Sequence, residues 1–257
     1  MADEAIFNRA DEWILDGATW SLVAGSLAAG STLDVLSSLR PQKRIMFTSG
    51  TATIRATIPG AKTARCFALP VSNADNGTLT IANGAGFSLA VPIPTMPAGR
   101  IPRTAVIQFP APAASTTWDV IIAGSSANVI LGGAIWFGQS LHTFGRNFRN
   151  GFRPSVKRFV ADVVNPSGAQ YHINHRTIQR AFDFDVAALT AQIAEMEDWQ
   201  RSQTANGSDI SLFWPDPTVN DAYLGNWTND FAPTMYVGPN YHPLQTKFTE
   251  LSKGQPV

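Results

Sequence analysis

The sequence predicts a mainly β protein, an antiparallel β-sandwich followed by a smaller β module with one α-helix. Three observations support this fold class. Residues 20–137 are rich in Thr, Val, Ile and Ala. Gly, Pro and Asn interrupt this region about every 8 to 12 residues, a spacing typical of sandwiches and barrels. No segment in it sustains the 3.6-residue period of an amphipathic helix. A chain of 257 residues is long enough for one large β domain or two smaller ones.

Short alternating or apolar runs define the expected strands of the first half. Residues 51–58 alternate and stop at Pro59-Gly60, and residues 66–71 form a mostly apolar run. Further strands are predicted at residues 78–82, 104–109, 117–122 and 129–137. Trp118 and Trp136 stand inside apolar runs, so they are expected in the core.

The character of the chain changes between residues 138 and 158, where we place a domain boundary. This divides the chain into an N-terminal arm (1–12), a β-sandwich (13–140) and a second β-rich module (141–257). In that module residues 160–164 and 169–173 flank Asn165-Pro166-Ser167-Gly168, which has the residue preferences of a type I turn. The sequence therefore predicts a hairpin there.

A strand, a helix and two more strands are expected after the hairpin. The strand covers residues 177–185. The helix spans about 186–204, because Val186, Leu189, Ile193 and Met196 form an apolar stripe behind the capping residue Asp185. The last strands are predicted at residues 210–214 and 245–251.

Composition excludes several classes of partner. The net charge is zero, which argues against binding nucleic acid or an anionic membrane by charge. No run of about 18 apolar residues is present, which argues against membrane insertion. The single cysteine, Cys66, excludes an internal disulfide and a multi-cysteine metal site, and we expect it to be buried and inert. The acidic start and the lack of a long apolar run predict a soluble protein of the cytoplasm. Only 15% of residues are charged, which predicts surface covered by partner subunits.

The search for catalytic chemistry predicts no enzyme, no metal and no cofactor. The histidines are His142, His172, His175 and His242. His172 and His175 would lie on opposite faces of a strand, which is wrong for a metal pair. No nucleophile elbow, phosphate loop or zinc-protease motif is present. A pair of carboxylates could form in space, so a glycan hydrolase is kept as a third alternative.

Seven tryptophans are many for this length, and they have two interpretations. Indole rings stack on sugars, but they also anchor cores and interfaces through their large area. Trp214, Trp227 and Tyr223 stand in turn-rich sequence, so they are the candidates for a surface that binds a glycan or a subunit.

A basic cluster follows the domain boundary. It consists of Arg146, Arg149, Arg153, Lys157 and Arg158, with Phe148 and Phe152 between them. Basic residues interleaved with aromatics occur in nucleic-acid-binding segments. Arginine is also favoured at interfaces, where it pairs with carboxylates. In a neutral chain we favour an ion-pair seam between domains or subunits.

Three short segments resemble a known family. They are residues 49–56 (SGTATIRA), 68–73 (ALPVSN) and 130–138 (ILGGAIWFG). Together they look like the discoidin-like, galactose-binding-like jelly-roll sandwich of tail-tip and baseplate proteins of tailed bacteriophages. The resemblance implies a structural subunit of the virion tail, assembled in the host cytoplasm. Its implied partners are other tail or baseplate proteins and further copies of itself in a ring or trimer. The alternative is a carbohydrate-binding module that recognises a glycan of the host surface.

Overall fold

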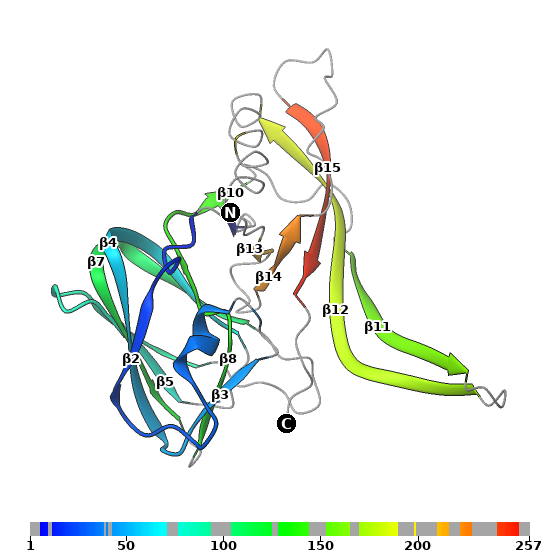
Figure 1. Cartoon of the computed structure of the whole chain (residues 1–257). Coiled ribbons are helices and arrows are strands. Elements are labelled where there is room, and N and C mark those ends of the chain that lie inside the picture. The colour runs from blue at the N-terminus through cyan, green and yellow to red at the C-terminus, as the bar shows by residue number, and fades with distance from the viewer. Residues whose placement is uncertain are drawn as a thin grey trace.

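The computed structural model describes residues 6–9, 12–38, 40, 43–70, 77–93, 104–124, 128–143, 153–164, 170–189, 198, 210–215, 222–227 and 241–251. This part of the chain is mainly β, and every pairing between its strands is antiparallel, as the sequence predicts. Two large sheets contain most of the strands (Figure 1). Among these residues no helix has the length and apolar character needed to cross a membrane.

The first large sheet has six strands. In spatial order they are β2 (Thr19–Ala24), β4 (Thr51–Pro70), β7 (Thr104–Ala123), β5 (Thr78–Ala82) and β6 (Ser88–Pro92), with β9 (Trp136–Gly138) paired to β4. Along β4, Ala52, Ile54 and Ala56 are buried, whereas the residues between them reach the surface. The predicted alternation of residues 51–58 therefore sorts one face into the core and the other toward water.

Two expected strand ends are wrong, because strands continue where the sequence predicts turns. β4 runs through Pro59-Gly60 and joins the runs that we expected as separate strands. β7 runs through Pro110 in the same way. The register with β7 shifts between Thr57 and Lys62, so the sheet absorbs the proline and glycine as an irregularity. A proline and a glycine at a bulge can therefore bend a strand without ending it.

A second layer closes the core of the sandwich. β3 (Arg44–Phe47) pairs with β8 (Val129–Gly132), and the 3-10 turn Leu33–Ser37 lies nearby. Ile45, Phe47 and Leu131 from these elements join the buried cluster that also holds Trp118 and Trp136. Both tryptophans are completely buried, which confirms their expected place in the core.

The second large sheet has seven strands. In spatial order they are β10 (His142–Thr143), β1 (Ile6–Asn8), β13 (Ile210–Trp214), β14 (Tyr223–Trp227), β15 (Tyr241–Glu250), β12 (Gln170–Leu189) and β11 (Arg153–Val164). The start of the chain is thus a strand between β10 and β13. Leu212 and Leu224 belong to the same buried cluster as the sandwich residues. The hydrophobic core is therefore continuous between the two large sheets.

The expected helix at 186–204 is wrong at its start. β12 continues to Leu189, and its residues 186–189 pair with Leu244–Tyr241 of β15. Phe182, Phe184 and Val186 also alternate, so this stretch fits a strand as well as a helix, and pairing with β15 decides between them. Asp198 is helical, and the other residues expected in this helix lie outside the described part of the chain.

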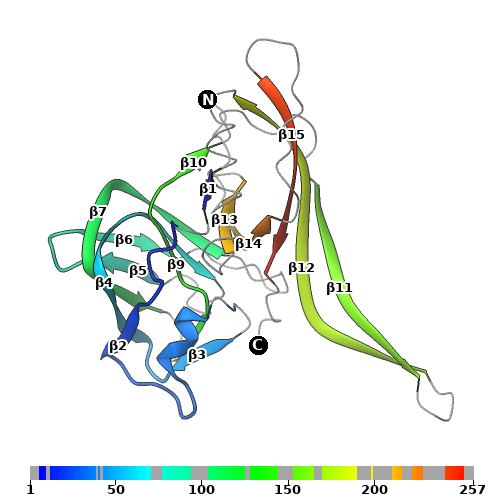
Figure 2. The same ribbon diagram turned by 45° about the horizontal axis from the view of Figure 1, so that its top comes forward.

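The predicted hairpin is confirmed by the pairing of β11 with residues 170–183 of β12, which together we call the ribbon. Both views show the ribbon bending away from the rest of the molecule (Figure 2). β12 pairs with β15 only from Ala181 onward. Among the described strands, residues 170–180 therefore pair with β11 alone.

Candidate functional site

The expected surface aromatics lie in the interior. Trp214, Trp227 and Tyr223 are only 6%, 7% and 6% exposed. Trp227 contacts Phe213 and Phe248, with ring centroids 5.4 and 5.0 Å apart. β13 and β14 are inner strands of the seven-stranded sheet, so neighbouring strands help to bury these rings. The turn residues beside them in the sequence predict a surface position instead. Sequence alone does not show the inner position of these strands, and these rings do not offer a sugar-stacking face.

The basic cluster is only partly described. Arg153, Lys157 and Arg158 lie on β11, opposite Asp183, Gln179 and Ile178 of β12. Arg146 and Arg149 lie outside the described residues. The cluster therefore extends onto the base of the ribbon, and its role as an ion-pair seam stays a prediction.

A buried charged group that the sequence does not indicate fixes the base of the ribbon. Arg180 is 9% exposed, and its Nε lies 3.8 Å from Oε2 of the completely buried Glu250. Its guanidinium also lies 5.1 Å from the ring centroid of Tyr223. These contacts join β12, β14 and β15 at the point where the ribbon leaves the sheet. Moving Arg180 away would leave a buried carboxylate without this cation beside it, so the pair disfavours other orientations of the ribbon base.

A second polar group connects the start of the chain to β10. Oε1 of Glu12 accepts a hydrogen bond from Oγ of Ser140 and lies 2.6 Å from Nε2 of His142. The other carboxylate oxygen accepts the Arg9 amide at 2.9 Å. The His142 ring stacks on Phe7 of β1, with centroids 5.4 Å apart. Sequence reasoning missed this group because Glu12 is far from the other two residues in the chain.

The geometry of this group differs from that of a hydrolase triad. In a triad one imidazole nitrogen contacts the serine and the other contacts the carboxylate. Here Nε2 of His142 lies 3.2 Å from Oγ of Ser140 and also faces Glu12. The serine hydroxyl donates directly to the carboxylate, so it is not arranged to pass its proton to the histidine. We interpret the group as a structural link between β1, β9 and β10.

Glu12 gives a testable dependence on pH. Burial raises the pKa of this carboxyl, but hydrogen bonds from His142, Ser140 and Arg9, with the charge of His142, bring it below its usual value of 4.5. A carboxyl whose pKa is lowered on folding stabilises the protein above its unfolded pKa, and this stabilisation is lost as the pH falls through the folded value. We expect urea unfolding between about pH 6 and 3 to show a smaller loss of stability in Glu12→Gln than in the wild type. The exposed Asp16→Asn variant is the control, and an equal loss in Glu12→Gln and wild type would contradict the role of Glu12.

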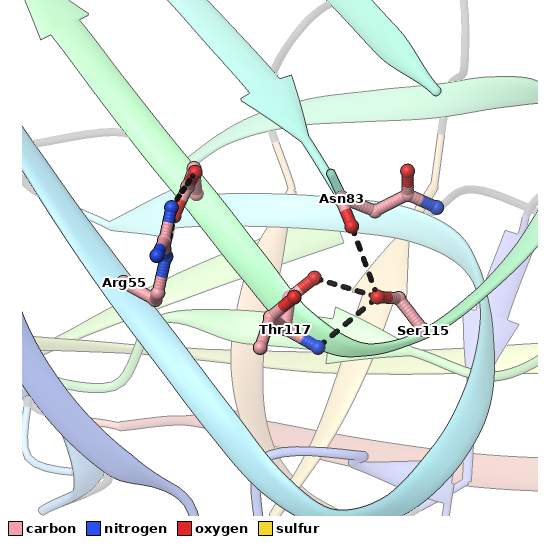
Figure 3. A network of polar contacts seen from close by, with 5 residues as sticks. Arg55, Asn83, Ser115 and Thr117 are labelled. Atoms are coloured by element: carbon pink, nitrogen blue, oxygen red, sulfur yellow. Dashed lines mark hydrogen bonds and ion pairs between the residues drawn. The ribbon is translucent and has the colours of Figure 1, made fainter. Parts of the chain in front are cut away.

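Two further polar contacts order the six-stranded sheet (Figure 3). Arg55 donates to both carboxylate oxygens of Asp119 at 2.6 and 2.7 Å, and these hydrogen bonds raise the pKa of Arg55. The Ser115 hydroxyl lies 3.1 Å from the Asn83 carbonyl oxygen and accepts the Thr117 amide at 3.0 Å. These contacts fix the path of β7 beside β5.

Cys66 and metal-binding residues offer no reactive centre in the described part of the chain. Cys66 is completely buried, and this burial raises the pKa of its thiol to about 12. The expected burial is confirmed. Such a thiol is a poor nucleophile at neutral pH, and its inertness stays a prediction. No group of three or more His, Cys, Asp or Glu residues among the described residues is arranged to hold a metal ion.

Comparisons with known proteins found similarity only among solved structures. No protein-family model and no curated protein matches the chain. The family 32 carbohydrate-binding module of NanJ from C. perfringens, in complex with galactose, matches with a TM-score of 0.39 at 11% identity, over 51% of this chain and 98% of that chain. CpGH89CBM32-5 from Clostridium perfringens, in complex with GalNAc-β-1,3-galactose, matches with a TM-score of 0.37 at 10% identity, over 49% and 98% of the two chains.

A larger protein is also similar. Truncated AlyQ, described with CBM32 and alginate lyase domains, matches with a TM-score of 0.32 at 14% identity, over 67% of this chain and 49% of that chain. All four matching structures are described as containing family 32 carbohydrate-binding modules, and none is described as a bacteriophage protein. A likeness of this degree carries no argument about the ligand of this chain.

Proposed function

We propose that this chain is a structural subunit of a multi-subunit assembly, in which the ribbon docks on the next copy of the same chain. The ribbon carries this proposal. It projects from the body of the molecule (Figures 1 and 2), and over residues 170–180 its strands pair only with each other among the described strands. A two-stranded ribbon is at best marginally stable in water, so a partner would supply the packing it lacks.

The pairing register sets which positions share a side of the distal part of the ribbon. Val163 stands opposite Tyr171, and Ala161 opposite Ile173, so these four positions share one side, and all four residues are apolar or aromatic. On the other side Val160, Asp162 and Val164 stand opposite Asn174, His172 and Gln170, a mixture of apolar and polar residues. The first side is therefore the one whose sequence suits packing on a partner.

A second copy is the partner that the composition favours. The chain has no net charge and few charged residues, so copies can pack closely without mutual repulsion. A ribbon that docks on the body of the next copy makes a head-to-tail contact, and such contacts close into rings when the rotation permits. The tail tip or baseplate of a tailed bacteriophage is the assembly that the sequence resemblance suggests. This part of the proposal is supported by those short segments alone.

Substitutions on the two faces of the ribbon test the proposal. We expect Ile173→Asp to reduce the sedimentation coefficient of the assembled protein, because a carboxylate would enter the apolar contact. His172→Asp adds the same group to the next residue on the opposite face and should leave the assembly intact. A wild type that sediments as a monomer, or equal behaviour of the two variants, would contradict the proposal.

A shortened ribbon provides an independent check. Arg158 and Ile178 pair with each other in the ribbon. Deleting residues 159–164 and 169–177 would keep this pair and join its two residues by the predicted turn at 165–168. We expect normal unfolding of the body and loss of the ring contact.

The basic cluster has its own test. The double variant Arg149→Glu with Arg153→Glu should weaken assembly, and intact assembly would contradict the hypothesis of an ion-pair seam.

Carbohydrate binding is the second candidate, and Trp20 is the observation that favours it. Among the tryptophans that the structure describes, Trp20 alone is not buried. It lies on the edge strand β2, and its Nε1 donates to Oγ of Ser37 at 2.6 Å. The ring is half-buried and packs partly against the hydrophobic core, so the part that stays exposed is what a sugar could meet.

A glycan array with the full chain tests this candidate. Binding that Trp20→Ala abolishes and the ribbon variant Ile173→Asp preserves would favour the carbohydrate-binding role. Absence of binding to every glycan, or binding that Trp20→Ala leaves unchanged, would exclude Trp20 as the sugar platform.

A further inference from the structure

The surface of the six-stranded sheet that faces away from the core has an unusual composition, and we call it the outer face. The register of the five strands defines it, and each of its residues is exposed or half-buried. Threonine is its commonest residue, and most of the others are small. Its members are Thr19, Ser21 and Val23; Thr51, Thr53, Arg55 and Thr57; Thr117, Asp119, Ile121 and Ala123; Thr78, Thr80 and Ala82; and Ser88, Ala90 and Pro92.

Charge is almost absent from the outer face. Among these members the only charged residues are Arg55 and Asp119, which stand opposite each other on β4 and β7 and hold each other in a two-point ion pair. Lys62 and Arg65 of β4 lie beyond the register shift that follows Thr57, outside these members. Exposed sheet surfaces of soluble proteins normally carry many more charges, which keep copies apart. The side chains around the pair are short, so another flat surface can approach the backbone closely.

We propose that the outer face is a two-fold interface that stacks on the outer face of a second copy of this chain. The pattern of charge on the outer face indicates that its partner is a second copy of the chain. A two-fold axis near the ion pair brings Arg55 of one copy toward Asp119 of the partner subunit, and the reverse, so all four charges have opposite neighbours. A face that carries one cation and one anion side by side is complementary to itself, as a two-fold contact requires.

The rest of the outer face fits the same arrangement. Stacked sheets lie about 10 Å apart and interdigitate their side chains. Ile121 on the central strand β7 is half-buried, and with Ala123 and Ala90 it provides apolar area near the ion pair. A strongly charged partner, such as a nucleic acid or an acidic protein, would leave one member of the ion pair against a like charge. This interface is separate from the ribbon and does not depend on the proposed ring.

Charge substitutions at the ion pair test the interface in the full-length chain. Arg55→Asp leaves two carboxylates on each outer face, and Asp119→Arg leaves two guanidinium groups. We expect each variant alone to show half the wild-type mass in light scattering. An equimolar mixture should recover the full mass, because an acidic face then meets a basic one. Recovery on mixing requires contact between two copies of this face.

A second variant, away from the ion pair, distinguishes loss of the interface from misfolding caused by changing Arg55 or Asp119. Thr80→Lys places an extra cation on the outer face and should also halve the mass. Gln108→Lys is exposed on β7 but outside the outer face, and should have no effect. Unchanged mass in Arg55→Asp and Thr80→Lys, or no recovery in the mixture, would overturn the proposal. Loss of the ribbon contact alone leaves a dimer, whereas loss of this interface alone leaves a single ring, so the two proposals fail in distinguishable ways.

Discussion

Replacement of Trp118 by alanine is expected to lower the free energy of unfolding by about 3–5 kcal/mol, the cost of emptying a large aromatic site in a closed core. The Trp118 side chain is completely buried. Its ring lies 5.3 Å from Phe137 and 6.0 Å from both Phe109 and Phe87, measured between centroids. Phe137 lies on β9, Phe109 on β7 itself and Phe87 just before β6, so these rings cannot all close the cavity without moving the sheet. Urea unfolding followed by circular dichroism gives the value.

Trp118→Phe is the matched control for this prediction. No acceptor among the described residues receives a hydrogen bond from the buried Nε1 of Trp118. Phenylalanine keeps much of the ring volume and removes that polar group, so its cost should be clearly smaller than that of alanine. If the two variants lose equal stability, the packing argument for Trp118 is wrong.

Gly225→Ala is expected to be more damaging than alanine at any other glycine whose surroundings the structure describes. Gly225 lies in β14 opposite Glu250 of β15. A Cβ at this position would lie 2.1 Å from the carbonyl oxygen of Thr249 and 2.8 Å from Cα of Glu250. Backbone atoms cannot turn aside as a side chain can, so β14 and β15 would have to separate. The cost should exceed the ~1–3 kcal/mol typical of an overfilled core.

Gly60→Ala provides the comparison for Gly225→Ala. A Cβ on Gly60 meets no atom within 4 Å, and its backbone is outside the left-handed region. The substitution should change stability by no more than about 0.5 kcal/mol, as expected of a surface site. Thermal unfolding of the two variants side by side measures the difference. A similar melting temperature for both would show that β14 and β15 tolerate separation.

The sequence predicts those strands whose pattern is local. Residues 51–58 alternate in sequence and in burial, and the predicted strand at 210–214 has the same bounds as β13. The turn chemistry of residues 165–168 predicts the pairing of β11 with β12 correctly. In each case one short segment contains the information, because side-chain alternation and turn preference depend on neighbouring residues.

Features that depend on distant pairing could not be predicted. Residues 186–189 fit both a strand and a helix, and only β15 settles the choice. Trp214 and Trp227 stand beside turn residues, but the surrounding strands bury them. The contact between Glu12 and His142 and the ion pair of Arg180 and Glu250 each join residues that lie far apart in the sequence. No pattern within a short stretch of sequence predicts such contacts.

The position of β1 inside the seven-stranded sheet has a consequence for the timing of synthesis. Ile6 of β1 pairs opposite Trp214 of β13, which lies far along the chain, so Ile6 must wait until Trp214 has been translated. The base of the ribbon waits longer still, because β12 is held there by β15, which follows β13 and β14 in the chain. Pairings between such distant segments form slowly. A nascent chain therefore cannot anchor the base of the ribbon until β15 has been translated.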